Sequence, residues 1–146
     1  MSKTILVPVD GSEHSKKALE FAADYCAGKG GQLFLLHVVQ SLPHDRTLVL
    51  GAAAITIHDT RDNLEKAGAK VIEAAKQVAA EHGCRSVDTK SVLGDPAAEI
   101  VDMATEINAD MIVMGSRGLS DLKGLMVGSV SHKVNQLAPC TCVSVR

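Results

Sequence analysis

The stretch that decides the fold is "TILVPVDGSEHSKKALEFAADYCAGKGGQLFLLHVV", residues 4–39. Its first six residues form a short run rich in β-branched side chains, which is typical of a buried parallel strand. Apolar side chains then recur at helical spacing from Ala18 to Cys26, behind Ser12 as the expected N-cap, and glycines end the pattern. A second apolar run follows at residues 32–39. The stretch therefore predicts a strand, a helix and a second strand.

The same alternation continues along the rest of the chain. We expect a helix from about Asp59 to His82, and the later elements are a strand at 86–93, a helix at 96–107, a strand at 109–115, a helix at 129–138 and a strand at 141–145. Residues 40–58 have no clear period, and we treat them as a variable connection with room for a helical turn. Residues 1–146 thus predict one α/β domain: a five-stranded parallel sheet in the order 3-2-1-4-5, with helices on both faces.

This strand order also predicts where a ligand binds. In an open parallel sheet, ligands lie outside the carboxyl ends of the strands that flank the reversal of direction. Here these are the first and fourth strands, which are followed by "PVDGS" at 8–12 and by a glycine-rich segment from Gly115 to Ser129. The topology and the glycine cluster therefore indicate the same place.

The glycine-rich segment has the spacing Gly115-x2-Gly118-x9-Gly128-Ser129. Glycine lets backbone N–H groups approach a ligand closely, and the amino end of a helix favours an anion. This chemistry suits a chain of phosphates. Neither a P-loop nor a G-x-G-x-x-G pattern after a strand is present. On spacing alone, the alternative that these glycines only make turns stays open.

The segment and four others together resemble a known family. The motif G-x2-G-x9-G-[ST] after "VMGSRG" is similar to the ATP-binding signature of the universal stress protein family. Four further segments match that family in the same order along the chain: "ILVPVDGSEHSKKAL", "LLHVV", "GDPAAEIVDMA" and "APCTCVSV". The resemblance covers all of the chain except 40–58. It implies a Rossmann-like fold that binds ATP.

At the base and ribose end, the resemblance implies contacts from the first two strands. Pro8, Val9 and Asp10 would meet adenine and ribose, with Asp10 accepting from the sugar hydroxyls. Val38 would offer its backbone to the adenine edge. His37 lies inside an apolar strand, where a histidine is more often satisfied by the core than used as a ligand.

At the phosphate end, the resemblance implies contacts from the glycine-rich segment and the last helix. The residues implied are Met114, Gly115, Gly118, Gly128, Ser129 and Val130, with the hydroxyls of Ser129 and Ser131 as further donors. Arg117 occupies a variable position of the motif. Its guanidinium could meet the phosphates or lie in solvent, and both alternatives stay open.

Composition excludes several partners. Fifteen basic and seventeen acidic residues balance, and aromatic residues make up 2% of the chain, so we expect no nucleic-acid partner. The longest apolar run, residues 48–57, is about half of the roughly 20 residues that a membrane span needs. The four cysteines lack metal or disulfide spacing. We expect a cytoplasmic protein with reduced thiols, no direct membrane insertion and no metal site.

The functional expectation is an ATP-binding regulatory protein that acts on a client protein through nucleotide-dependent loop order and oligomer state. A membrane transporter or its regulator is one class of client considered, and the need for Mg²⁺ stays open. The last strand, 141–145, would pair at the sheet edge to form a homodimer or higher oligomer. The alternative is a slow ATPase or nucleotidyl-transfer enzyme. We see no catalytic residues and no Walker-type lysine, so binding is favoured over catalysis.

Overall fold

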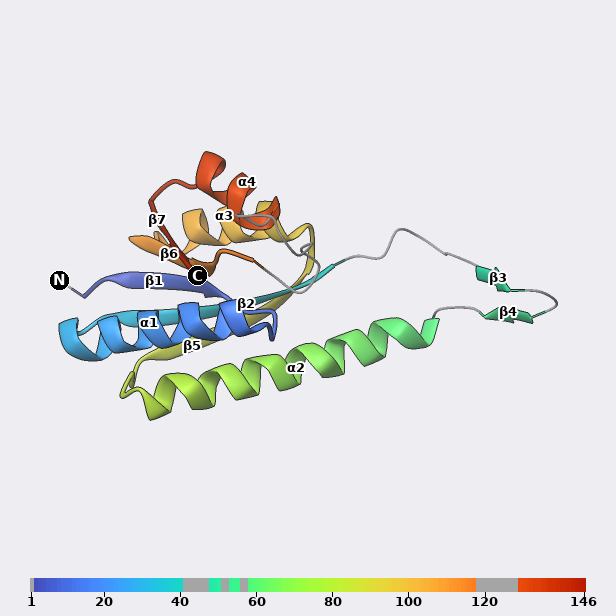
Figure 1. Cartoon of the computed structure of the whole chain (residues 1–146), viewed down its shortest axis with the longest axis horizontal. Helices are drawn as coiled ribbons and strands as arrows, with labels where there is room; N and C mark the ends of the chain where they lie inside the picture. Colours follow the sequence, from blue (N-terminus) through green and yellow to red (C-terminus); the bar gives the residue numbers. More distant parts are fainter. Residues whose placement is uncertain (1, 41–47, 51–52, 56–57, 118–128) are drawn as a thin grey trace.

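The computed structural model describes residues 2–40, 48–50, 53–55, 58–117 and 129–146. Apart from β3 and β4, its strands and helices alternate along the chain as the sequence predicts (Figure 1). The strands are β1 (Thr4–Pro8), β2 (Gln32–Gln40), β3 (Leu48–Leu50), β4 (Ala53–Ile55), β5 (Val87–Gly94), β6 (Met111–Gly115) and β7 (Thr141–Val145). The helices are α1 (Glu13–Lys29), α2 (His58–Glu81), α3 (Pro96–Glu106) and α4 (Ser129–Leu137).

The main sheet confirms the predicted topology. Its order is β5-β2-β1-β6-β7, and every neighbouring pair is parallel. Numbered among the five predicted strands alone, this order is 3-2-1-4-5. The reversal of direction falls between β1 and β6, whose pairing aligns Ile5 with Met111 and Leu6 with Ile112.

The connection from 40 to 58 is described only in part, and the expected helical turn does not appear in the described residues. The described part of that connection holds β3 and β4, which pair antiparallel in a two-stranded sheet of their own. Each strand is three residues long. A period of two cannot be recognised over so short a run, and backbone pairing between the two runs decided the structure.

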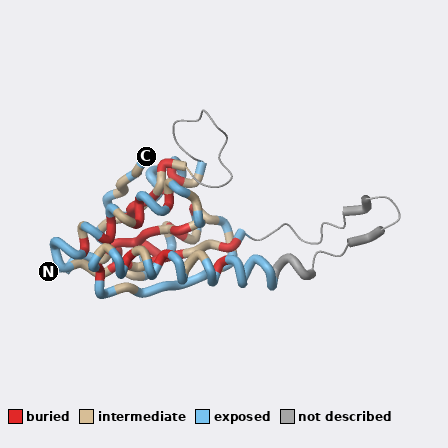
Figure 2. The backbone as a smooth tube through the Cα atoms, turned by 60° about the horizontal axis from the view of Figure 1, so that its bottom comes forward, coloured by how far each residue is buried: buried red, intermediate tan, exposed pale blue. Residues whose placement is uncertain are grey.

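Helices cover both faces of the main sheet, so that its central strands are buried on each side (Figures 1 and 2). On one face, α1 and α2 pack over side chains such as Ile5 and Val7. On the other face, α3 and α4 pack over Leu6 and Ile112. All four side chains are fully buried. Because successive side chains of a strand point to opposite faces, an uninterrupted apolar run serves both cores.

Caps set the ends of the helices, and at α1 they are the residues that the sequence predicts. Ser12 caps α1 by accepting from the Ser15 N–H, and Gly30 ends that helix with a left-handed φ of 74°. Asp95 caps α3 by accepting from the Ala98 N–H. Pro96 follows it in the first turn of α3, where its missing N–H costs nothing.

Candidate functional site

A cavity of about 430 Å³ opens at the carboxyl ends of β1, β2 and β6, where the topology places a ligand. Among the predicted site residues, those that line it are Pro8, Val9, Asp10, Val38, Met114, Gly115, Arg117, Val130 and Ser131. Ser129 begins α4 and is exposed. Gly118 and Gly128 lie outside the described residues. The fold therefore brings together residues that are more than 100 positions apart in the sequence.

The turn from β1 into α1 holds Asp10 through a short hydrogen-bond network. The Asp10 N–H donates to the Ser15 hydroxyl at 3.2 Å, and the Ser12 N–H donates to Asp10 Oδ1 at 2.9 Å. Gly11 between them has φ of 85°, a left-handed conformation that glycine adopts without strain. Together these contacts fix the carboxyl group of Asp10 at the wall of the cavity.

The ends of β1 and β2 place backbone groups at the same wall. The Val9 N–H donates to the Leu36 carbonyl at 2.8 Å, and the Val9 carbonyl lies 2.8 Å from His37 Nδ1. A carbonyl oxygen only accepts, so Nδ1 carries the hydrogen. As expected, His37 has a hydrogen-bond partner within the protein at this ring nitrogen. The residue also lines the cavity.

The far wall is formed where β6 ends and α4 begins. Gly115 packs so closely on α1 that a Cβ there would lie 2.6 Å from the carbonyl carbon of His14. The Ser116 N–H donates to the Val145 carbonyl at 2.7 Å, and the Ser131 hydroxyl donates to the Ser116 carbonyl at 3.3 Å. Ser131 therefore ties α4 to the end of β6, instead of directing its hydroxyl hydrogen at a ligand.

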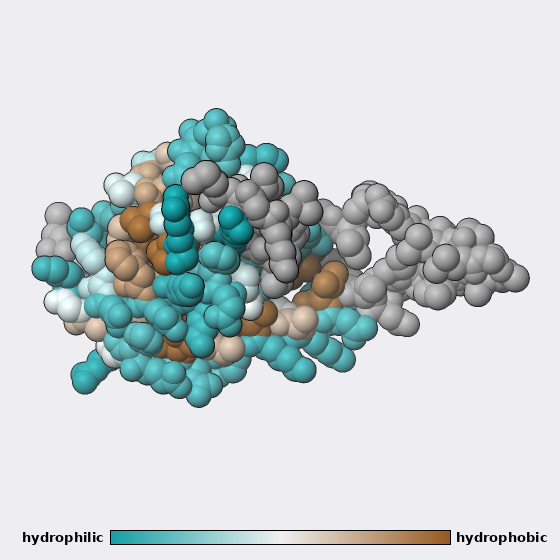
Figure 3. Space-filling model, viewed as in Figure 1, coloured by the Kyte–Doolittle hydropathy of each residue, from teal (hydrophilic) through white to brown (hydrophobic). Residues whose placement is uncertain are grey.

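Sequence reasoning missed the contribution of α2, which supplies Leu64, Ala67, Gly68 and Val71 to the lining. These side chains make one wall apolar, and Figure 3 shows hydrophobic surface beside α2, next to the region drawn in grey. One signal was available: Gly68 interrupts a stretch of strong helix formers at a cost of roughly 0.5–1 kcal/mol relative to alanine. Such a residue in mid-helix has a packing reason.

The side chains outside the cavity offer little chemistry. Within the described ranges, no group of three or more His, Cys, Asp or Glu residues could hold a metal ion. All four cysteines are free thiols. Burial, with the neighbouring Cys84 as a second cause, raises the pKa of Cys26 to about 12, so this thiol is unreactive at neutral pH. Among the described residues, no helix is long and apolar enough to cross a bilayer.

The fold defines a doubly wound α/β protein with a cavity at its topological switch point, which is where ligands bind in proteins of this class. The model of the universal stress protein family matches residues 1–146, so the chain belongs to that family. It is 39% identical over 149 residues to the universal stress protein YxiE of Bacillus subtilis, with all of both chains covered.

Two solved structures show the same fold. The hypothetical protein MJ0577 superimposes with a TM-score of 0.81 at 28% identity, covering 99% of this chain and 96% of that one. The universal stress protein from Archaeoglobus fulgidus in complex with dAMP has a TM-score of 0.69 at 19% identity, covering 100% and 98%. At that identity, the second likeness concerns the fold alone.

Proposed function

We propose that this chain is an ATP-binding regulatory protein, in which the cavity at the carboxyl ends of β1, β2 and β6 holds the nucleotide. One observation carries the proposal: the cavity joins an apolar wall, a fixed carboxylate and the amino end of a helix in one continuous lining. A nucleotide presents a flat base, a sugar with hydroxyls and an anionic chain, which match these three features in turn.

The base would lie against the apolar wall. Val39 and Val71 line this wall beside α2, and Ile100 of α3 lines the cavity from the other face of the sheet. Val38 at the end of β2 would supply a backbone donor and a backbone acceptor to the base edge. About 430 Å³ is within the range of small-molecule sites. In the fold neighbour from Archaeoglobus fulgidus an adenine nucleotide, dAMP, is bound, which supports this choice at the level of the fold.

The ribose and phosphates would follow toward α4. Asp10 would accept from the sugar hydroxyls. Arg117 lines the cavity near the carboxyl end of β6, where its guanidinium would meet the phosphates. The amino end of α4, at Ser129 and Val130, adds N–H groups and a partial positive charge. Gly118 and Gly128 of the sequence motif complete the phosphate end in this proposal.

Regulation would use the edge of the sheet. The Val145 carbonyl pairs with β6, so by strand alternation the N–H and C=O of Cys142 and Ser144 face outward from β7. Figure 3 shows hydrophobic surface over the β6 and β7 region. Pairing two such edges would form a dimer, and nucleotide-dependent order beyond β6 would alter it.

The proposal is tested by titrating purified protein with ATP, ADP and AMP in a calorimeter, with and without Mg²⁺, and by sedimentation of the same samples. Asp10→Asn keeps one oxygen for the Ser12 N–H but removes the charge. We expect its Kd for ATP to rise about ten- to a hundredfold, the effect of losing a charged hydrogen bond.

Asp110→Asn, at the opposite end of the sheet, is the matched control and should bind like the unaltered protein. With 2′-deoxy-ATP, the difference between Asp10→Asn and the unaltered protein should shrink. Lack of binding by the unaltered protein to each of the three nucleotides would refute the proposal. Release of ADP in a single-turnover assay would favour the ATPase alternative.

A further inference from the structure

The hydrogen-bond ladder between β1 and β2 stops one step earlier than its register allows. The two strands pair from Thr4 with Gln32 to Pro8 with Leu36. The next pair in this register would be Val9 with His37, closed by a bond from the Val38 N–H to the Val9 carbonyl. Among the described residues, the last bond of this ladder is the one from the Val9 N–H to the Leu36 carbonyl, at 2.8 Å.

The side chain of His37 occupies the place of the missing bond. Its Nδ1 lies 2.8 Å from the Val9 carbonyl, which is the acceptor that the Val38 N–H would otherwise use. In a parallel strand, the N–H and C=O of one residue point to the same side, and successive residues alternate. Leu36 faces β1, so Val38 faces that side as well, where the chain beyond Val9 has turned toward α1. Both His37 and Val38 line the cavity.

Gly68 on α2 makes the room that the imidazole needs. A Cβ at this position would lie 2.7 Å from His37 Cδ2 and 3.0 Å from Nε2. Contacts under 3.0 Å are essentially never made by real Cβ atoms. The glycine in mid-helix and the histidine in an apolar strand are therefore two halves of one packing arrangement, which joins α2, β2 and the end of β1.

We propose that His37 is a positioning residue for the nucleotide base. Its ring donates to the Val9 carbonyl in place of the Val38 N–H, so the N–H and C=O of Val38 are left to face the ligand. Gly68 provides the space for the ring. This inference rests on the proposed function of the cavity. His37 acts through Val38 and Val9. The donor and acceptor of Val38 match the edge of a base that carries a ring nitrogen beside an amino group, as adenine does.

The first experiment compares His37→Leu with His37→Asn by amide hydrogen exchange and by ATP titration. Leucine cannot donate, so the Val38 N–H should close the ladder on Val9. Its exchange should slow at least about tenfold without ligand, and the Kd for ATP should rise about tenfold or more. Asparagine can donate from the position of Nδ1, so it should keep exchange and Kd within about threefold of the unaltered protein.

A second readout concerns the ring of His37. Nitrogen chemical shifts should show His37 with its hydrogen on Nδ1 in the absence of nucleotide, because that nitrogen faces a carbonyl. A purely structural role in packing would not require this tautomer. Hydrogen on Nε2 alone would overturn the inference.

The second experiment approaches the same contact from α2. Gly68→Ala should displace the ring, raise the Kd for ATP about tenfold and slow exchange at Val38. In the double variant with His37→Leu, Gly68→Ala should raise the Kd for ATP by less than a further threefold, because both changes remove the same contact. Gly28→Ala is the matched control in α1, where a Cβ would meet nothing within 4 Å, and it should leave the Kd unchanged.

The outcomes separate the two proposals. If the unaltered protein binds no nucleotide, the proposed function fails, while exchange at Val38 still tests whether His37 ends the ladder. If it binds ATP, but His37→Leu binds equally well or exchanges equally fast at Val38, the positioning role fails and the binding function stands.

Discussion

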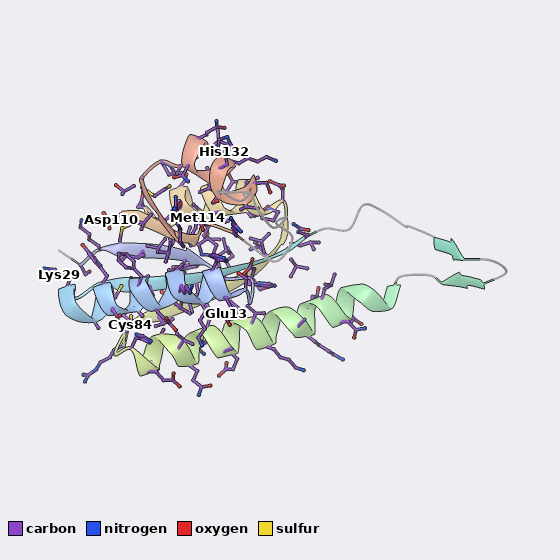
Figure 4. The ribbon with its side chains drawn as sticks, viewed as in Figure 1. Glu13, Lys29, Cys84, Asp110, Met114 and His132 are labelled. Carbon is purple, nitrogen blue, oxygen red and sulfur yellow. The ribbon has the colours of Figure 1, made fainter. Side chains whose placement is uncertain are left out.

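The two ends of the parallel sheet close in different ways. At the amino end, backbone carbonyls accept from backbone N–H groups: the Gln32 N–H donates to the Lys3 carbonyl at 2.8 Å, and the Asp110 N–H donates to the Thr4 carbonyl at 2.8 Å, while the Asp110 side chain accepts from the Thr4 N–H. At the carboxyl end, side chains of His37 and Ser15 take up backbone groups of Val9 and Asp10. Figure 4 shows Asp110, Lys29 and Cys84 toward one end, with Glu13 and Met114 nearer the other.

This difference bears on the binding site proposed at the carboxyl end. Backbone-to-backbone bonds satisfy donors and acceptors in pairs and leave nothing for a ligand. When a side chain donates to a backbone carbonyl, the backbone N–H that would otherwise donate there stays available, as the Val38 N–H does. The carboxyl end also carries a buried polar atom, His14 Nδ1, that has no hydrogen-bond partner within the described part of the chain. Most buried side-chain polar atoms in folded proteins have a hydrogen-bond partner, so His14 Nδ1 is an exception.

Gly115→Ala should give the largest effect and tests whether the carboxyl end is as tightly packed as the geometry indicates. The new Cβ would lie 2.6 Å from a backbone carbon of His14, which has no rotamer to change. We expect a loss of about 2–4 kcal/mol in the free energy of unfolding, measured by urea denaturation. Gly28→Ala, with open space around its Cβ, should instead be neutral or stabilising. If Gly115→Ala lost less than about 0.5 kcal/mol in the free energy of unfolding, the carboxyl end of the sheet would be packed less tightly than the geometry indicates.

Ser15→Ala should give an intermediate effect. Ser15 is buried, and its hydroxyl accepts from the Asp10 N–H. Because alanine suits the helix, the cost should be that of one lost hydrogen bond, about 1 kcal/mol in urea denaturation. The Kd for ATP should rise about two- to fivefold, since Asp10 is held less firmly. An unchanged Kd would mean that the turn holds Asp10 without this bond.

Asp110→Asn should give the smallest effect on stability and sharpens the contrast at the amino end. Its Oδ2 accepts from the Thr4 N–H at 2.8 Å at an exposed position, and the amide oxygen of asparagine can replace it. We expect less than about 0.5 kcal/mol of lost stability.

The same substitution should be visible in thiol chemistry. Burial first, and the charge of Asp110 second, raise the pKa of Cys140 above its usual value. Removing the charge lowers that pKa, so more thiolate is present at a given pH. Alkylation of Cys140 by iodoacetamide, followed by mass spectrometry, should speed up in Asp110→Asn. An equal or slower rate would contradict the assigned cause.

Sequence patterns predicted the elements of the main sheet, their order and the place of the cavity. These features depend on local periodicity, on caps such as Ser12, and on the right-handed crossovers of parallel strands. The short strands β3 and β4 were not predictable, because three residues carry no usable period. The role of α2 in the lining was missed, since which face of a long helix meets a cavity depends on packing, although Gly68 was a hint. The ligand contacts of the site residues stay predictions.

The sequence by itself determined that this is a parallel α/β protein whose first and fourth strands flank a glycine-rich segment, because apolar runs, caps and glycines act over a few neighbouring residues. Only the tertiary structure decided that His37 reaches the Val9 carbonyl, that Gly68 makes room for its ring, and that Ser131 bonds to Ser116. These contacts join residues far apart in the chain, and they form only when helices and strands are packed at distances that no local pattern encodes.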